Sequence, residues 1–206
     1  NGLGNEAALA DLADPERVRG AMCFVCLNRI APGLVHHLAH GSIVLGQYLH
    51  LPSADTQALA DLFRSVGVPC TLAANLEQAH WEKLVWNIPF NGLGVAGIVG
   101  VDPMTATTAA VPPARTRTLA TDELLANPAW ERWLRALMHE VITTARALGF
   151  PLSAALADQM IARTRCMGAY RASTLLDFEH GLPLELHSLF LEPARLARQA
   201  GVPTPH

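Results

Sequence analysis

The chain has 206 residues, half of them hydrophobic, which is enough to bury a sizeable core and excludes a disordered or fibrous protein. Its formal net charge of -3 provides no basic excess for a phosphate backbone or an anionic bilayer, so we expect neither nucleic acid nor a membrane as partner. No apolar run has bilayer-spanning length and the chain does not begin like a signal peptide, which predicts a cytoplasmic protein with reduced cysteines.

The first part of the chain alternates between strand and helix signals. β-rich runs separated by turn residues predict a meander over residues 22–27, 34–38 and 42–45. An amphipathic pattern then predicts a helix over Asp55–Val66, closed by Gly67, and a short strand follows over 68–72. Residues 1–76 are therefore interpreted as the final part of an α/β domain.

From residue 77 onward the periodicity is helical, and we place a domain boundary there. The clearest helix begins with Asn127 as N-cap and Pro128 in its first turn, and it ends at Gly149. Its apolar stripe includes Trp130 and Trp133, which could serve a core or an interface equally well.

Two further helices complete this part of the chain. One is expected after Ser153, and the other runs from about residue 187 to residue 200. Residues 77–206 are therefore predicted to form an all-helical domain. The predicted fold class is an α/β remnant followed by an all-α C-terminal domain.

Residues 92–97 match the dinucleotide-binding pattern GxGxxG by letter. A true fingerprint follows a strand and has an acidic residue about 20 positions further on, which holds the ribose. Here the preceding residues 81–88 have a helical pattern, and neither Asp nor Glu occurs between Asp102 and Asp122. We therefore interpret these glycines as places where a helix approaches closely or where a ligand lies against the bare backbone.

Two other clusters resemble metal-binding patterns by letter alone. Cys23 and Cys26 form a CxxC inside a β-rich run, without the second pair that a zinc site needs. His36, His37 and His40 have no carboxylate or thiolate nearby in the sequence, and neighbouring residues of a strand point to opposite faces. We expect strand packing and surface histidines there, and no metal.

Lys83 is the only lysine among fifteen basic residues, and lysine, unlike arginine, can exchange a proton near neutral pH. On a helix, Lys83, Asn87 and Asn91 share one face within an arc of about 80°. Two amides and one ammonium on a common face suit a small polar anion. A water-facing polar stripe explains the same spacing, so the spacing alone leaves both interpretations open.

Three separated motifs resemble the ketopantoate reductase family. Residues 81–91, with the lysine and two asparagines at steps of four, are similar to the family's lysine signature. Residues 173–185 are similar to its Ser-x-x-x-Asp and Gly-x-Pro-x-Glu stretch, with the same step from serine to glutamate. Residues 1–6 resemble the loop that follows a strand of the family's cofactor domain. The matches span nearly the whole chain in the expected order.

The resemblance implies a Rossmann-type dinucleotide-binding domain, of which residues 1–76 are the C-terminal part, followed by a helical substrate domain at 77–206. It implies reduction of a 2-oxo acid by NADPH, with ketopantoate converted to pantoate for pantothenate biosynthesis in the cleft between the domains. The phosphate-binding part of the Rossmann domain would precede residue 1, so this polypeptide alone is expected to bind NADPH poorly and to be inactive.

The resemblance also implies roles for individual residues. Lys83 would donate the proton to the nascent alkoxide, and Glu185 would hold the ammonium and touch the cofactor's ribose. The substrate's polar groups would be bound by a larger set, namely Asn87, Asn91, Ser173 and Asn1. Asn1 would also contact the cofactor.

Residues 101–102 are Val-Asp where family members often carry a further substrate asparagine. The substrate therefore stays open between ketopantoate and another branched or hydroxylated 2-oxo acid. From a different class, the chain could be a non-catalytic helical module for dimerisation or ligand sensing. A homodimer is compatible with either interpretation.

Overall fold

The computed structural model describes residues 2–96 and 118–206, so Asn1 and residues 97–117 lie outside the description. The chain divides into two compact units, one formed by Gly4–His80 and the other by Trp81–His206 together with Gly2 and Leu3. Each unit has a hydrophobic core of its own. The domain boundary predicted after residue 76 stays a prediction.

The sheet of the Gly4–His80 unit has three strands in the order β1-β2-β3. β1 (Arg19–Ala31) pairs antiparallel with β2 (Leu34–Gln47), and Gly33 in the intervening turn has a φ of 75°, which favours glycine. β3 (Cys70–Leu72) pairs parallel with β2, and α2 (Ala54–Ser65) forms the crossover that parallel strands require. The predicted α/β character of this part is confirmed.

The predicted meander of three runs is wrong in one respect, because the second and third runs form the single strand β2. Gly41 marks a bulge instead of a strand end, since the pairing register shifts between Phe24 and Val25. His40 and Gly41 have φ values of 62° and 134° at this point. A bulge adds one residue to a strand without ending it, which the turn signal could not reveal.

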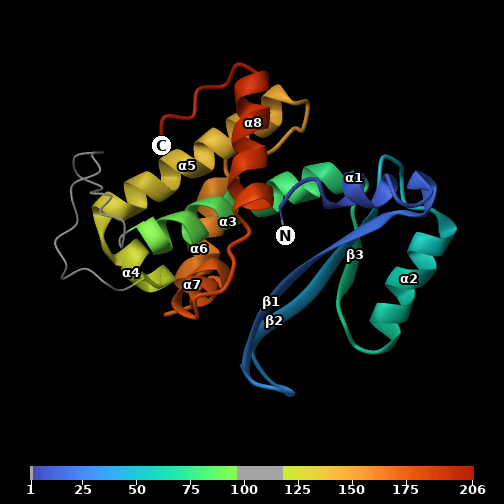
Figure 1. Cartoon of the computed structure of the whole chain (residues 1–206), viewed down its shortest axis with the longest axis horizontal. Coiled ribbons are helices and arrows are strands. Elements are labelled where there is room, and N and C mark those ends of the chain that lie inside the picture. The colour runs from blue at the N-terminus through green and yellow to red at the C-terminus, as the bar shows by residue number, and fades with distance from the viewer. Residues whose placement is uncertain (1, 97–117) are drawn as a thin grey trace. The chain divides into compact units, whose positions relative to one another are not determined.

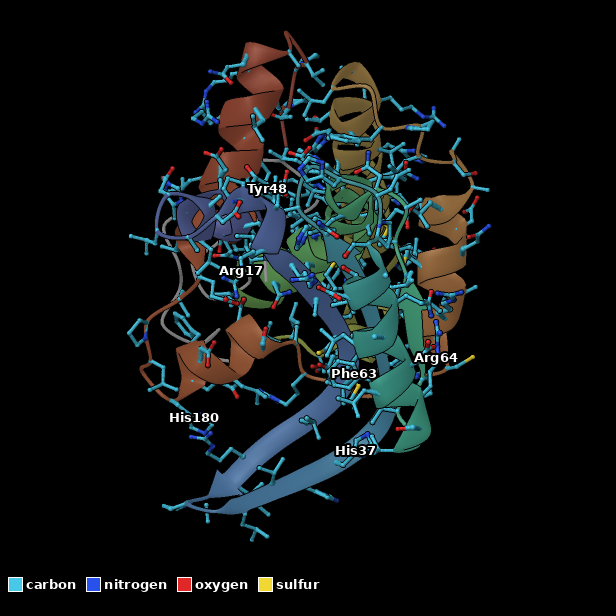
Figure 2. The ribbon with its side chains drawn as sticks, turned by 90° about the vertical axis from the view of Figure 1, so that its right-hand side faces the viewer. Arg17, His37, Tyr48, Phe63, Arg64 and His180 are labelled. Atoms are coloured by element: carbon cyan, nitrogen blue, oxygen red, sulfur yellow. The ribbon has the colours of Figure 1, made fainter. Side chains whose placement is uncertain are left out.

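α2 packs on the sheet through one apolar face. Its Ala60 is buried with Leu45 and Cys70 of the strands, and Figure 2 shows Phe63 on the side of α2 that turns toward them. Arg64 Nε donates a hydrogen bond to the Cys70 carbonyl oxygen at 2.7 Å, which ties β3 to the helix. The predicted helix and short strand are therefore confirmed at α2 and β3.

Two short helices, α1 (Asn5–Ala10) and the 3-10 helix η1 (Pro15–Arg17), precede the sheet. Gly20 and Gly46 are direct partners in β1 and β2. A Cβ atom on Gly20 would lie 2.4 Å from Glu6 Oε1, and one on Gly46 would lie 2.9 Å from Leu76 Cβ. The glycine pair therefore makes room for Glu6 and Leu76 against the strands.

The other unit is helical throughout the residues that the structure describes. It contains α3 (Leu76–Ala96) from Trp81 onward and a series of shorter and longer helices: α4 (Thr121–Ala126), α5 (Pro128–Ala147), α6 (Leu156–Arg165), α7 (Ser173–Glu179), the π-helix η2 (His187–Leu191) and α8 (Glu192–Gln199). Figure 1 shows α3 running through this unit among the other helices. Its core joins residues of α3, α4, α5, α6, α7 and η2. The predicted all-helical C-terminal part is confirmed.

α5 follows its predicted signals closely. The Asn127 side chain accepts a hydrogen bond from the Ala129 N–H at 2.9 Å, Pro128 is the first helical residue, and Gly149 follows the helix with a φ of 95°. Trp130 of the apolar stripe is buried, and Trp133 packs against the same core. Of the helices in the described ranges, none has the length and apolarity needed to cross a bilayer.

Candidate active site

The predicted polar stripe of α3 lies in a largely buried part of the molecule. Asn87 and Asn91 are only 6% and 2% exposed, and Lys83 is half-buried. Trp81, Leu84 and Phe90 of the same helix are each 1% exposed, so α3 is deeply buried in this unit. The water-facing interpretation of the stripe is therefore wrong for the two asparagines.

Asn91 links α3 to the beginning of α7. Its Oδ1 accepts a hydrogen bond from the Thr174 N–H at 3.0 Å, and its Nδ2 donates one to the Asn87 carbonyl oxygen at 2.9 Å. The N-cap residue of α7, Ala172, has no side chain that could accept this N–H. Asn91 therefore provides from another helix the hydrogen bond that an N-cap side chain normally makes.

Ser173 is the first residue of α7 and its side chain is exposed. Thr174, the next residue, is 5% exposed and carries the N–H that Asn91 binds. The structure thus brings Asn91 close to Ser173, with Thr174 as the link, and Asn87 lies one turn before Asn91 on α3.

Gly92 and Gly94 allow two other segments to approach this part of α3. A Cβ atom on Gly94 would lie 2.4 Å from Leu175 Cδ1, and one on Gly92 would lie 3.3 Å from Phe190 Cε1. Both glycines lie inside α3, which is a helix and not the strand-to-helix loop of a dinucleotide fingerprint. The interpretation of residues 92–96 as a close-approach segment is confirmed, and Gly97 lies outside the described residues.

Glu185 lies at the surface, one residue before Leu186, where the final helical segment begins. Its carbonyl oxygen accepts a hydrogen bond from the Leu189 N–H at 3.2 Å. Phe190 of the same segment packs at Gly92, next to Asn91. The segment after Glu185 therefore packs on the same part of α3, around Asn91 and Gly92, that binds the start of α7.

Lys83 and Glu185 both have interaction partners in the structure. The ion pair predicted between them stays a prediction. Asn1 lies outside the described residues, but Leu3 is 8% exposed and donates its N–H to the Ser188 carbonyl oxygen at 3.0 Å. The start of the chain is therefore held on the segment after Glu185.

The predicted site residues carry the kinds of group that a small polar anion needs. An amide nitrogen carries two N–H groups, so the one that Asn91 does not donate to Asn87 can serve a ligand. The exposed hydroxyl of Ser173 can donate and accept, the ammonium of Lys83 can donate a proton, and the carboxylate of Glu185 can accept hydrogen bonds. Side chains of these types match a carbonyl compound that also carries a carboxylate.

Two features around α7 could not be predicted from the sequence. The first is the pairing of Asn91 with Thr174, which are 83 residues apart and therefore share no local pattern. The second is a polar cluster around α7, in which Arg171 contacts both Thr118 and Glu179, and Thr118 donates to Glu179. Thr118 is 1% exposed, and the helical start at Ser173 was hidden because Ala172 is a poor N-cap.

The clusters of cysteine and histidine lie in the other unit. Cys26 is buried in β1 and Cys23 is exposed, while His37 Nε2 lies 2.7 Å from the carbonyl oxygen of His40. Cys23, His37 and His40 line a pocket of about 630 Å³ between the hairpin and the turn at residues 67–69. Within residues 2–96 and 118–206, no three His, Cys, Asp or Glu side chains gather as metal ligands would.

Comparison with protein-family models matches most of the chain. The model described as "Ketopantoate reductase PanE/ApbA C terminal" matches residues 75–206, and that described as "Ketopantoate reductase PanE/ApbA" matches residues 1–50. These two ranges contain the three motifs singled out in the sequence.

Similar proteins and structures carry related names. The chain is 32% identical over 210 residues to a 2-dehydropantoate 2-reductase of Nostoc sp., covering 100% of this chain and 60% of that protein. A crystal structure of 2-dehydropantoate 2-reductase from Geobacter metallireducens is 37% identical with a TM-score of 0.85, covering 100% of this chain and 62% of that one. That from Methylococcus capsulatus is 31% identical with a TM-score of 0.82, covering 100% and 63%. The chain thus spans about three fifths of the length of these relatives.

Proposed function

We propose that this chain, which belongs to the ketopantoate reductase family, supplies the substrate-binding and proton-donating groups of an enzyme that reduces a 2-oxo acid. The observation that carries the proposal is the buried pair Asn87 and Asn91, which is joined to Ser173 through Thr174. Burying an amide costs free energy that an apolar side chain at the same place would not, so two buried asparagines beside an exposed hydroxyl support a binding site.

The proposed reaction reduces the C2 carbonyl of the 2-oxo acid to a secondary alcohol. When bound, a nicotinamide cofactor, which we take to be NADPH, supplies the hydride. The carbonyl oxygen becomes an alkoxide as C2 accepts the electron pair, and the ammonium of Lys83 donates the proton that neutralises it. Lys83 then regains a proton from solvent, so that charge and protons balance.

The remaining side chains are proposed to hold the substrate in place. Asn87, Asn91 and Ser173 would bind its carboxylate and hydroxyl groups, which fixes the carbonyl at reacting distance. Glu185 would pair with the Lys83 ammonium and accept a hydrogen bond from the cofactor's ribose. Its exposed position fits a carboxylate that meets a ligand instead of packing in a core. We assign Asn1 to the same junction of substrate and cofactor.

Replacing Lys83 tests the proposal most directly. In the complete polypeptide that contains this chain, we expect Lys83→Ala to lower kcat for ketopantoate by about a hundredfold or more, because general-acid catalysis is lost. Lys83→Arg keeps the charge but cannot donate a proton near neutral pH, so it should stay equally slow. Arg163→Ala, which removes an exposed cation on α6, is the control and should keep wild-type kcat. Wild-type turnover in Lys83→Ala would exclude the proposed role.

The substrate is proposed to be ketopantoate, with pantothenate biosynthesis as the pathway. Another branched or hydroxylated 2-oxo acid is the alternative, since the family assignment does not distinguish them. A panel of such acids, assayed by oxidation of NADPH and of NADH, compares kcat/KM for each substrate and cofactor. If none is turned over, the non-catalytic dimerisation or ligand-sensing module becomes the better interpretation, and sedimentation with and without the acids then tests for a homodimer.

A further inference from the structure

The final helical segment begins with a π turn whose position is explained by Pro193. In η2 the Glu192 N–H donates to the His187 carbonyl oxygen, five residues earlier, instead of to the carbonyl of Ser188. A proline ring inside an α-helix clashes with the carbonyl four residues before it, which for Pro193 is that of Leu189. Leu189 is 0% exposed, so water cannot solvate its carbonyl in an α-helical arrangement. The π turn avoids this clash.

With the π turn in place, the Ser188 carbonyl oxygen has no N–H donor from residue 193. The backbone N–H of Leu3, at the start of the chain, donates to it instead. In π pairing the carbonyl of Ser188 would receive the N–H of residue 193, but proline has none. The Leu3 N–H donates to this carbonyl at 3.0 Å. Gly2 has a φ of 81°, and a Cβ atom there would lie 2.4 Å from the carbonyl carbon and oxygen of Ser188, so only glycine fits.

The hydrogen-bond register of the π turn determines the direction in which the side chains before it point, relative to α8. One extra residue in a helix rotates the residues before it by about 100° relative to the residues after it. Glu185 stands two residues before η2, while Phe190 within η2 is fixed at Gly92 of α3. Because the Glu185 carbonyl oxygen accepts the Leu189 N–H at 3.2 Å, a change from π to α pairing would rotate the turn Glu185–Leu189 as a unit relative to α8 and thereby redirect the Glu185 carboxylate.

We propose that Pro193, the Ser188 carbonyl and the Gly2-Leu3 backbone form a positioning device that holds the π turn and thereby aims Glu185 at its partners in the active site. This inference rests on the proposed function, in which Glu185 pairs with Lys83. Pro193 and Gly2 act only through Glu185 and touch no reacting atom.

A double-mutant cycle in the complete polypeptide tests this inference. Pro193→Ala removes the clash and permits α pairing, and we expect kcat for ketopantoate to fall about tenfold while KM changes less than threefold, since substrate contacts remain. Glu185→Gln should lower kcat by at least as much. In the Glu185→Gln background, Pro193→Ala should have no further effect, because its influence passes through that carboxylate. Pro128→Ala, at the start of α5, is the matched proline control and should leave kcat unchanged.

A second measurement reports on the anchor itself, independently of activity. Exchange of the Leu3 amide hydrogen, measured by NMR, should be at least tenfold faster in Pro193→Ala and in Gly2→Ala than in wild type or Pro128→Ala. A tenfold loss of kcat that persists in the Glu185→Gln background, or unchanged Leu3 exchange in Pro193→Ala, would overturn the positioning device. Unchanged kcat in Glu185→Gln would instead remove Glu185 from the proposed function, and the device with it.

Discussion

The C-terminal half of α3 and the tip of the β1–β2 hairpin expose opposite kinds of side chain. Asn87 and Asn91 are 6% and 2% exposed, whereas the apolar Ile30 and Val35 near the tip are 61% and 53% exposed. Among the residues that the structure describes, no buried side-chain nitrogen or oxygen lacks a hydrogen-bond partner. The helical unit therefore accommodates polar side chains in its interior by giving each buried nitrogen and oxygen a hydrogen-bond partner, while the hairpin leaves apolar surface that adds little to its own stability.

Truncating one apolar residue in each region should give the largest contrast. Phe90 is 1% exposed and stacks on Trp86 with 4.9 Å between ring centroids. We expect Phe90→Ala to lower the free energy of unfolding by about 3–5 kcal/mol, because it leaves a cavity in the core. Ile30→Ala at the hairpin tip should change it by less than about 0.5 kcal/mol. Urea unfolding monitored by circular dichroism measures both, and equal costs would contradict the comparison.

Asn91 and Asn127 each accept a hydrogen bond at the start of a helix, so comparing them shows how burial of the asparagine changes the free energy of unfolding. Asn91 binds the N–H of the second residue of α7 and is buried, while Asn127 binds the N–H of the second residue of α5 and is exposed. Asn127→Ala should cost about 1 kcal/mol, the usual loss for an N-cap, because the Asn127 side chain itself is exposed. Asn91→Ala should cost more, up to about 3 kcal/mol, because Asn91 is 2% exposed and its removal leaves the Thr174 N–H unpaired at a buried position. Urea unfolding of both variants at one pH decides this, and equal costs would show that water reaches Thr174.

Local sequence signals predicted those parts of the fold that local interactions determine. The start of α5 is predicted by Asn127 and Pro128, and the end of α2 by Gly67, because caps and left-handed glycines act within one turn. The burial of the α3 stripe could not be predicted in this way. Whether Asn91 faces water or a ligand depends on Thr174, which lies 83 residues away.

The π turn shows a signal that was present but not used. Pro193 inside a predicted helix indicates a break or a change of hydrogen-bond register. The helix predicted from about residue 187 to residue 200 is in fact η2 with α8 directly after it. The choice between a break and a π turn depends on whether another segment can bind the released carbonyl, and Leu3 does so from the opposite end of the chain.

Two buried threonines allow a single buried hydrogen bond to be measured. Thr164 and Thr144 are 1% and 2% exposed, and each donates its hydroxyl to the carbonyl four residues earlier. Only Thr164 also accepts a hydrogen bond from the Trp86 indole N–H, at 2.9 Å. We therefore expect Thr164→Val to cost about 1 kcal/mol more than Thr144→Val in thermal or urea unfolding. If Thr144→Val costs as much, the indole N–H finds another partner.

The smallest expected effect concerns the pH dependence of the sheet unit. Glu6 Oε1 lies 3.0 Å from His80 Nε2, with side chains 13% and 9% exposed. Burial raises the pKa of Glu6, but the hydrogen bond and charge of His80 outweigh it, so this pKa lies below its ordinary value of 4.5. Because the folded pKa is the lower one, the contribution is present above the unfolded pKa and is lost as the pH falls through the folded pKa.

Glu6→Gln removes this contribution, so its cost relative to wild type in urea unfolding should be larger near about pH 6 than near about pH 3.5. The difference should be small, because burial and His80 shift the pKa of Glu6 in opposite directions. Glu16→Gln, which removes an exposed carboxylate from η1, controls for the change in net charge. A cost of Glu6→Gln that grows as the pH falls would reverse the sign of the argument and show that burial outweighs the imidazole at this site.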